Sequence, residues 1–258
     1  MKRALLEIFA PVFFSQSAGL NIVFMQKYYM EQLYNSDLFV QIGTNDGNDR
    51  FNKLVEQYKP KHVILIEPNQ TLYDTIVSNY NHISKHTNIT IINKCIYSRD
   101  DETVSLFIPA KDGIYGNPGV QPERKQSNYT YNNKHFSLIP MNDWGEKKNM
   151  VEIKSTTITF KTLCRLYNIS KINYLQIDTE GYDSEIISNI DLEMTDIKII
   201  RFEKWSFDEN CFSKYHNENK HLYGLNGMKN VENILRFYNY TLQNISDEDG
   251  DDIIAFKQ

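Results

Sequence analysis

The chain has 258 residues, of which 41% are hydrophobic and 24% charged, and its formal net charge is −5. This length and composition are typical of one large α/β domain or two small ones, with a core that needs neither disulfides nor metal. The acidic balance, without a run of lysine and arginine, disfavours a protein that binds nucleic acid, and no apolar run reaches membrane-spanning length.

The cysteines and the first residues bear on the cellular compartment. Cys95, Cys164 and Cys211 are odd in number, and they have neither the spacing of a disulfide framework nor that of a zinc site. The start, MKRALLEIFAPVFF, is a poor secretion signal, because Glu7 interrupts its apolar stretch and no clear small-residue cleavage site follows. We therefore expect a cytoplasmic protein with reduced, packed thiols.

Residues 1–37 form an N-terminal segment that precedes the core. Its apolar side chains recur at helical spacing, and they include Leu5, Ile8, Phe9, Met25, Tyr28, Tyr29 and Leu33. The spacing predicts one or two helices. We interpret this segment as a helical cap or as an arm that forms a homo-oligomer, and the sequence leaves both open.

From residue 38 to residue 258, strands and helices alternate in a single predicted domain. The predicted strands are Leu38–Ile42, His62–Ile66, Ile89–Ile92, Tyr174–Asp178 and Lys198–Phe202, with Thr103–Ile108 as an extra strand or hairpin arm. The predicted helices are Asp49–Tyr58, Gln70–Ile83, Phe160–Tyr167, Ser184–Ile190 and Asn230–Phe237. Thr241–Ile245 and Ile253–Phe256 predict a closing antiparallel hairpin. This pattern predicts an α/β fold with a mostly parallel sheet and helices on both faces.

Two irregular inserts interrupt the alternation, at about residues 109–150 and 207–230. Irregular segments of this length within a compact domain are usually functional or disordered. Both inserts are rich in aromatic side chains, namely Tyr115, Tyr129, Tyr131, Phe136, Trp144, Trp205, Phe207 and Tyr223. Flat apolar rings suit the faces of sugar rings, although they also pack lids onto a sheet. We interpret the inserts as substrate lids, with a saccharide or a glycosylated small molecule as the acceptor.

The turn after the first strand indicates a cofactor without phosphates. Gly43 and Gly47 flank Thr44, Asn45 and Asp46, whereas a dinucleotide-binding turn has the pattern G-x-G-x-x-G. Asp46 would repel a pyrophosphate but would suit a cofactor that carries a cation and an amino-acid moiety. S-adenosylmethionine has this chemistry. The same turn is also compatible with a simple strand-to-helix connection.

Glu67 ends the second strand, twenty residues after Gly47. A carboxylate in this place accepts hydrogen bonds from both hydroxyls of a ribose. Pro68 and Asn69 follow it, so Glu67 could also be a favourable negative charge at the start of the next helix. Both roles are compatible with each other, and we favour the ribose role.

The segment INYLQIDTEGYD, Ile172–Asp183, predicts a third functional strand end. Because side chains alternate along a strand, Asp178 and Glu180 are expected to point to the same side. Two neighbouring carboxylates in a cleft require a cationic or protic partner. The partner could be the sulfonium of the cofactor, a divalent metal or a proton of the substrate. Alternatively, Glu180 caps the next helix while Asp178 alone faces the ligand.

Five segments together resemble the FkbM-type S-adenosylmethionine-dependent methyltransferases: FVQIGTNDG, VILIEPN, INKCIYS, TTITFKTLCRLYNISKINYLQIDTEGYD and IIRFEKW. The fourth segment is the most specific, since the glycine turn is shared by many cofactor-binding folds. The resemblance runs from about Leu38 to the C-terminus and excludes the two inserts. It implies a Rossmann-like class I methyltransferase fold and methylation of a hydroxyl group, commonly of a sugar or a natural product.

The resemblance also implies which residues contact the cofactor. Gln41 stands where many methyltransferases have an acidic residue, so Asp46 or Asp178 is expected to hold the methionine amino group instead. Cys95 takes the place of a small residue near the adenine, as a packing neighbour and not as a nucleophile. The predicted cofactor-binding residues are Gln41, Gly43, Asn45, Asp46, Gly47, Glu67, Pro68, Asn69, Cys95 and Asp178.

Methyl transfer to a hydroxyl group requires close, in-line positioning and benefits from a general base. Asp178 is the first candidate base, Glu203 at the end of the strand IIRFE is the second, and Glu180 completes the predicted catalytic set. The products would be a methyl ether and S-adenosylhomocysteine. A magnesium- or calcium-type ion on Asp178 and Glu180 is an open alternative. Histidines in the inserts, His135, His216 and His221, are weaker candidates for a base, and His216, Glu218 and His221 are a weak candidate for a metal site.

Two other classes of function remain open at the level of the sequence. One is a nicotinamide-dependent oxidoreductase, which the missing third glycine and the acidic turn disfavour. The other is a non-catalytic cofactor-binding or assembly protein of the same fold. The intact set of glycine turn, Glu67 and Asp178–Gly181 argues against loss of function, whereas Gln41 keeps that alternative open.

Overall fold

The computed structural model describes residues 28–34, 36–109, 138, 150–204, 207, 224–247 and 250–258. Most of the predicted N-terminal arm and most of both predicted inserts lie outside these residues. Their roles as cap, oligomerisation arm and substrate lids therefore stay predictions. Cys211 and the three histidines of the inserts, His135, His216 and His221, also lie outside the described residues.

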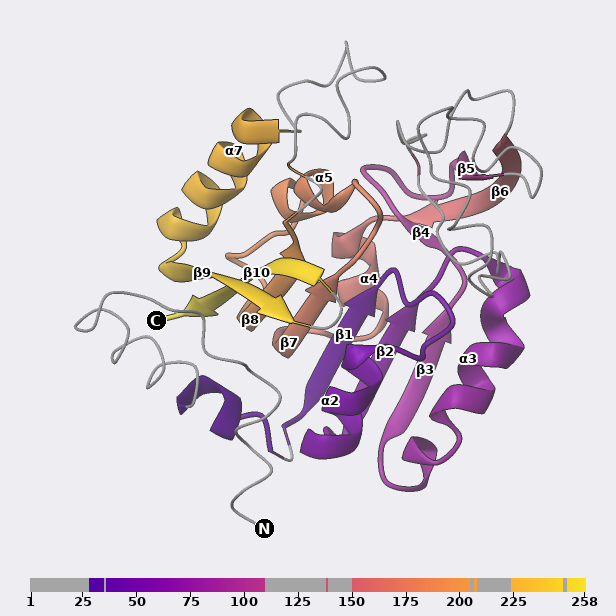
Figure 1. Ribbon diagram of the computed structural model, residues 1–258, viewed down its shortest axis with the longest axis horizontal. Helices are drawn as coiled ribbons and strands as arrows, with labels where there is room; N and C mark the ends of the chain where they lie inside the picture. The colour runs from indigo at the N-terminus through magenta and orange to yellow at the C-terminus, as the bar shows by residue number, and fades with distance from the viewer. Residues whose placement is uncertain are drawn as a thin grey trace, which may run out of the picture.

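A seven-stranded sheet forms the centre of the molecule, in the order β3-β2-β1-β7-β8-β10-β9 (Figure 1). Its strands are β1 (Leu38–Ile42), β2 (His62–Ile66), β3 (Asn88–Ile92), β7 (Lys171–Ile177), β8 (Asp196–Glu203), β9 (Tyr240–Asp247) and β10 (Gly250–Lys257). The first five strands of this order pair in parallel, and β10 pairs antiparallel with β8 and with β9. This confirms the predicted mostly parallel sheet with its C-terminal antiparallel hairpin, which is the Rossmann-like class I methyltransferase fold that the resemblance implies.

Side chains alternate between the two faces of the sheet and build two cores. On β1, Val40 and Ile42 pack into one core, whereas Phe39 packs into the other. The helices α4 (Phe160–Leu166), α5 (Asp183–Ser188) and α7 (Gly224–Phe237) cover the first face. The helices α2 (Arg50–Tyr58) and α3 (Tyr73–Tyr80) cover the second face. Helices therefore cover both faces, as predicted (Figure 1).

The helices α2 and α4 begin at residues whose side chains cap them, whereas α3 and α5 have no side-chain cap. The Asp49 side chain accepts a hydrogen bond from the Asn52 N–H and caps α2, which ends at Lys59 in the left-handed conformation. The predicted helix Gln70–Ile83 is shorter than expected, because α3 is flanked by 3₁₀ turns at Gln70–Leu72 and Ile83–Lys85. No helix in the described part of the chain has the length and the apolar character that a membrane-spanning helix needs.

A second, three-stranded sheet lies beside the central one, in the order β4-β6-β5. It comprises β4 (Cys95–Ile96), β5 (Thr103–Pro109) and β6 (Met150–Ile158). The extra strand predicted at Thr103–Ile108 is β5, which pairs antiparallel with β6. The sequence analysis missed β4 and β6, because their partners are distant in sequence and β4 is only two residues long.

Candidate active site

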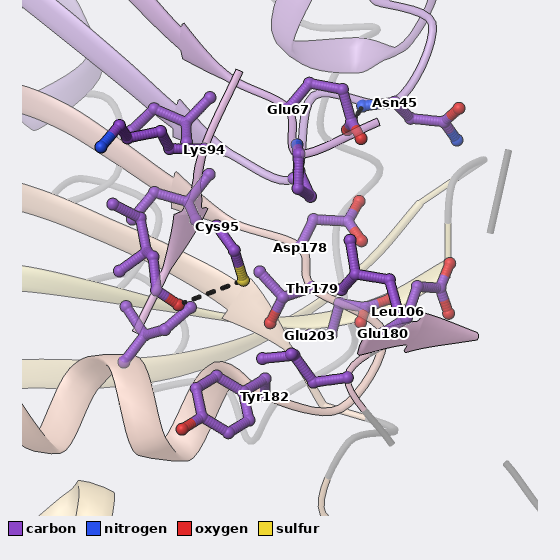
Figure 2. Close-up of a pocket in the computed structure, with 17 residues that line it drawn as sticks. Asn45, Glu67, Lys94, Cys95, Leu106, Asp178, Thr179, Glu180, Tyr182 and Glu203 are labelled. Carbon is purple, nitrogen blue, oxygen red and sulfur yellow. Dashed lines mark hydrogen bonds between the residues drawn. The ribbon is translucent and has the colours of Figure 1, made fainter. Parts of the chain in front are cut away.

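A cavity of about 190 Å³ opens at the carboxyl ends of β1, β2, β7 and β8, with β4 and β5 forming its side (Figure 2). Its lining combines apolar residues with four carboxylates, Glu67, Asp178, Glu180 and Glu203. Carboxyl ends of strands in an open α/β sheet are the usual place for a ligand. The apolar part of the lining is formed by Ile42, Ile66, Pro68, Cys95, Ile96, Leu106, Leu138, Tyr182 and Ile186.

Gly43 allows three strand ends to meet at the cavity. It has a φ of 82°, and its N–H donates to the Ile66 carbonyl at 2.9 Å. A Cβ atom on this residue would lie only 1.7 Å from the carbonyl oxygen of Asp178. A side chain of any kind is therefore excluded here, both by the left-handed backbone and by the close approach of β7.

Glu67 faces Asn45 across the same corner of the cavity (Figure 2). Its Oε2 accepts from the Asn45 N–H at 2.7 Å, and its Oε1 accepts from the Asn69 N–H at 2.8 Å. The residue is 4% exposed, and this burial raises the pKa of its carboxyl to about 7, although the two backbone hydrogen bonds lower it. Each oxygen retains a lone pair, so the carboxylate can accept two further hydrogen bonds.

Four of the predicted cofactor-binding residues lie outside the cavity lining. The fully buried Gln41 donates to the Asp49 carboxylate at 2.6 Å, and Gly47 packs beneath the Tyr80 ring. Asp46 accepts from the Asn48 N–H, and the buried Asn69 side chain accepts from Thr71. These residues shape the turns around the cavity, and a direct contact with a cofactor stays a prediction for each of them.

Cys95 and Lys94 form another part of the cavity wall. Burial, together with the nearby charge of Glu67, raises the pKa of the Cys95 thiol to about 12, and its Sγ lies 3.6 Å from the Ile96 carbonyl oxygen. Lys94 also lines the cavity, and its ammonium group pairs with Asp101 at 3.0 Å. The sequence analysis included Cys95 but missed Lys94, although both belong to the quoted segment INKCIYS.

The turn between β7 and α5 presents two of the carboxylates. Asp178 and Glu180 both line the cavity, with Thr179 between them. The alternation of a strand is not the reason, because β7 ends at Ile177 and Glu180 lies in a turn with a φ of 53°. Burial, followed by the charges of Glu180 and Asp183, raises the pKa of the Asp178 carboxyl well above its ordinary value. In Figure 2, Asp178 lies between Glu67 on one side and Glu180 and Glu203 on the other. The arrangement suits a ligand with a positive charge near Asp178.

Asp183 is a polar residue near the site that the sequence analysis did not single out. It is fully buried, and it accepts hydrogen bonds from Thr179 and from the Glu203 N–H. The signal was present in the sequence, because the segment DTEGYD ends in this carboxylate. Among the described residues, no group of three or more histidine, cysteine, aspartate or glutamate side chains is arranged to hold a metal ion.

The FkbM methyltransferase domain matches residues 41–242 of the chain. A search of curated proteins found no match. Three of the solved structures with a similar fold are an O-methyltransferase from Bacillus cereus in complex with SAH, a precorrin-6y C5,15-methyltransferase from Geobacter metallireducens and the METTL16 methyltransferase domain. Their identities are 10%, 10% and 9%, and their TM-scores are 0.45, 0.42 and 0.43. They cover 97%, 96% and 98% of this chain, which in turn covers 84%, 94% and 73% of theirs.

Proposed function

Since the chain belongs to the FkbM methyltransferase family and is an S-adenosylmethionine-dependent methyltransferase, we propose that it methylates a hydroxyl group of a sugar or glycan. The observation that supports this proposal most directly is the composition of the cavity. A buried carboxylate with free lone pairs, Glu67, lies at one end, and Asp178, Glu180 and Glu203 lie at the other. The two hydroxyl groups of a ribose fit the end with Glu67, and the hydroxyl group that receives the methyl group fits the end with the three other carboxylates.

The residues at the strand ends fit S-adenosylmethionine. Glu67 would hold the ribose hydroxyls, because its two oxygens are oriented by Asn45 and Asn69 and have acceptor capacity left. Gly43 lets the backbone of Asp178 approach the end of β1, and Cys95 and Ile96 would provide an apolar wall for the purine. When bound, the cofactor supplies an electrophilic methyl carbon on a positively charged sulfur.

We assign the general base to Asp178. A hydroxyl group is a weak nucleophile while it carries its proton, so a base within hydrogen-bond distance accelerates transfer. Burial and neighbouring charges raise the pKa of Asp178, and a carboxylate of higher pKa is a stronger base near neutral pH. The proton of the acceptor hydroxyl passes to Asp178, while Glu180 and Glu203 accept hydrogen bonds from adjacent hydroxyls and orient the acceptor.

The Asp178→Asn variant tests this assignment. The amide has nearly the same shape but cannot take up the proton, so we expect methyl transfer to fall by about 10²- to 10⁴-fold while S-adenosylhomocysteine still binds. Mass spectrometry would detect a deuterated methyl group transferred from labelled S-adenosylmethionine to a panel of neutral saccharides and glycosylated small molecules.

The Asp37→Asn variant is a matched control, since Asp37 is an exposed carboxylate that pairs with Lys61 away from the cavity. It should transfer the methyl group as the wild type does. Full activity of Asp178→Asn would remove this residue as the base. Methylation of amines or proteins by the wild type, with no hydroxyl product in the panel, would overturn the proposed acceptor class.

A further inference from the structure

The turn that carries Thr179 and Glu180 has an unusual backbone. Glu180 adopts a φ of 53° and Gly181 a φ of 108°, so two consecutive residues lie at positive φ. Glutamate rarely adopts this conformation, and it persists only where surrounding contacts enforce it. The position of the Glu180 side chain in the cavity therefore depends on whatever fixes this turn.

The carboxylate of Asp183 supplies the contacts that fix the turn. Its Oδ1 accepts from the Thr179 N–H at 3.1 Å and also from the Thr179 hydroxyl group. Its Oδ2 accepts from the Glu203 N–H at 3.0 Å. A single side chain thus connects the β7–α5 turn with the end of β8, which are the two segments that present the predicted catalytic carboxylates.

A carboxylate is the side chain that suits this position. Three donors converge on Asp183, and an ionised carboxylate offers acceptor sites on both oxygens and no donor. An asparagine would place an NH₂ group against either Thr179 or the Glu203 N–H. A purely structural connection would more often use a neutral group, because a charge this deeply buried is unfavourable.

We propose that Asp183 is the positioning residue of the active site: it joins the β7–α5 turn to the end of β8 and thereby sets the relative placement of Asp178, Glu180 and Glu203. This inference rests on the proposed methyl transfer. Asp183 contacts neither the cavity nor the reacting atoms, so it acts through Thr179 and Glu203.

The charge of Asp183 also affects Asp178. The groups whose charges raise the pKa of Asp178 are Glu180 and Asp183 on the β7–α5 segment, Asp49 at the start of α2 and Asp252 on β10. Glu67, Glu203 and Lys94 complete the charged lining of the cavity. Removing the negative charge of Asp183 therefore lowers the pH at which Asp178 ionises.

The Asp183→Asn variant tests the proposal without knowledge of the acceptor. Ionised Asp178 should favour the cationic S-adenosylmethionine over neutral S-adenosylhomocysteine, so the ratio of their Kd values changes with pH. Calorimetric titration with both compounds between about pH 5 and pH 9 would give the midpoint of this change. We expect the midpoint to move down by about half a pH unit or more in Asp183→Asn, with the Kd for S-adenosylhomocysteine unchanged within about threefold at high pH.

Methyl transfer to any acceptor that the saccharide panel identifies gives a second readout. We expect kcat of Asp183→Asn to fall by about tenfold or more, because small displacements of catalytic groups are costly. Should this variant fail to fold, Thr179→Val and Thr179→Ser provide the test. Valine removes the hydroxyl donor to Asp183 and serine keeps it, so valine should lose more of kcat than serine.

Asp100→Asn is the control, since Asp100 is an exposed carboxylate away from the cavity that accepts from the same kinds of donor. It accepts from the Thr159 N–H at 2.6 Å and from the Thr162 hydroxyl group at 2.7 Å. It should leave both the midpoint and kcat as in the wild type. If Asp183→Asn matches this control, or if Thr179→Val and Thr179→Ser have equal kcat, the positioning role is wrong. If the wild type binds neither compound, the proposed function itself is wrong.

Discussion

At the scale of single residues, Glu67 combines almost complete burial with hydrogen bonds from two backbone N–H groups. A buried carboxylate is stable only where such donors surround it. The same donors fix its rotamer, so that its remaining lone pairs point to a defined place. Glu67 therefore both connects the first two strand ends and prepares a site for hydroxyl donors.

Glu67→Gln should weaken the binding of S-adenosylhomocysteine. The amide NH₂ would face the N–H of Asn45 or Asn69, and the charged acceptor for the ribose would be lost. We expect Kd to rise by about 10- to 100-fold, which corresponds to roughly 1.4–3 kcal/mol for a hydrogen bond to a charged group.

Isothermal titration calorimetry would measure this change, with Glu56→Gln as the control. Glu56 is an exposed residue of α2, far from the cavity lining, and its variant should bind as the wild type does. Equal affinities of the two variants would contradict the ribose role of Glu67.

The sequence predicted these residues unevenly. Glu67, Asp178, Glu180 and Glu203 all line the cavity, because each lies at or shortly after the end of a strand that the apolar pattern marks clearly. Lys94, Leu106 and Asp183 were missed as site residues. Lys94 and Leu106 reach the cavity through the second sheet or its connection, and Asp183 acts through hydrogen bonds that no local pattern reveals.

At the scale of elements, the ends of β1, β2 and β7 lie so close that the backbone at Gly43 contacts the backbone of both neighbouring strand ends. Gly43 is the residue that permits this, because its N–H bonds to β2 while its Cα faces the end of β7. The position of the cavity thus follows from three strands that stop at the same level. Register between these strands is fixed by pairs such as Ile42 with Ile66 and with Ile177.

Gly43→Ala should destabilise the protein strongly. The new Cβ atom would lie 1.7 Å from the Asp178 carbonyl oxygen, so backbone has to move in a residue that already has a φ of 82°. We expect a loss of about 3 kcal/mol or more in the free energy of unfolding, measured by urea titration.

Gly47→Ala is the comparison variant. Its φ of 72° is similar, but the nearest atom to its Cβ is a Tyr80 ring carbon at 2.9 Å, and a side chain yields more easily than backbone. The Gly43 variant should therefore be the less stable of the two. The reverse order would show that the contact with β7 does not govern the turn.

Elements with strong local signals were predicted well. The bounds of β1 and β2 agree with the prediction, because both are mainly apolar runs that are followed by turn-forming or polar residues. The helix after β2 was predicted too long, since Gln70–Leu72 and Ile83–Lys85 form 3₁₀ turns instead. β6 was missed, because Met150–Ile158 alternates weakly and gains its pairing from the distant β5.

At the scale of the whole molecule, buried carboxylates link stability to pH. Burial raises the pKa of Glu67 from its ordinary value of 4.5 to about 7, and it also raises the pKa values of Asp178 and Asp183. For Glu67 the folded state binds more protons than the unfolded state between about pH 4.5 and pH 7. Its contribution to stability is complete below this window and is lost as the pH rises through about 7.

We therefore expect the ligand-free protein to unfold at a lower urea concentration at about pH 8 than at about pH 5, with a difference on the order of 3 kcal/mol from Glu67 alone. Glu67→Gln should show a smaller difference, since it lacks one of these groups. A higher urea midpoint at the higher pH would contradict this account.

Cys95 places a sulfur atom in the wall of the cavity that we propose receives an electrophilic methyl donor. A thiolate there would compete with the acceptor for the methyl group, and its methylation would modify the cavity wall irreversibly. Because burial and the adjacent Glu67 charge raise the pKa of Cys95 to about 12, the thiol keeps its proton at physiological pH and stays a poor nucleophile. The carboxylate proposed to bind the ribose thus also helps to keep Cys95 from being methylated by the cofactor.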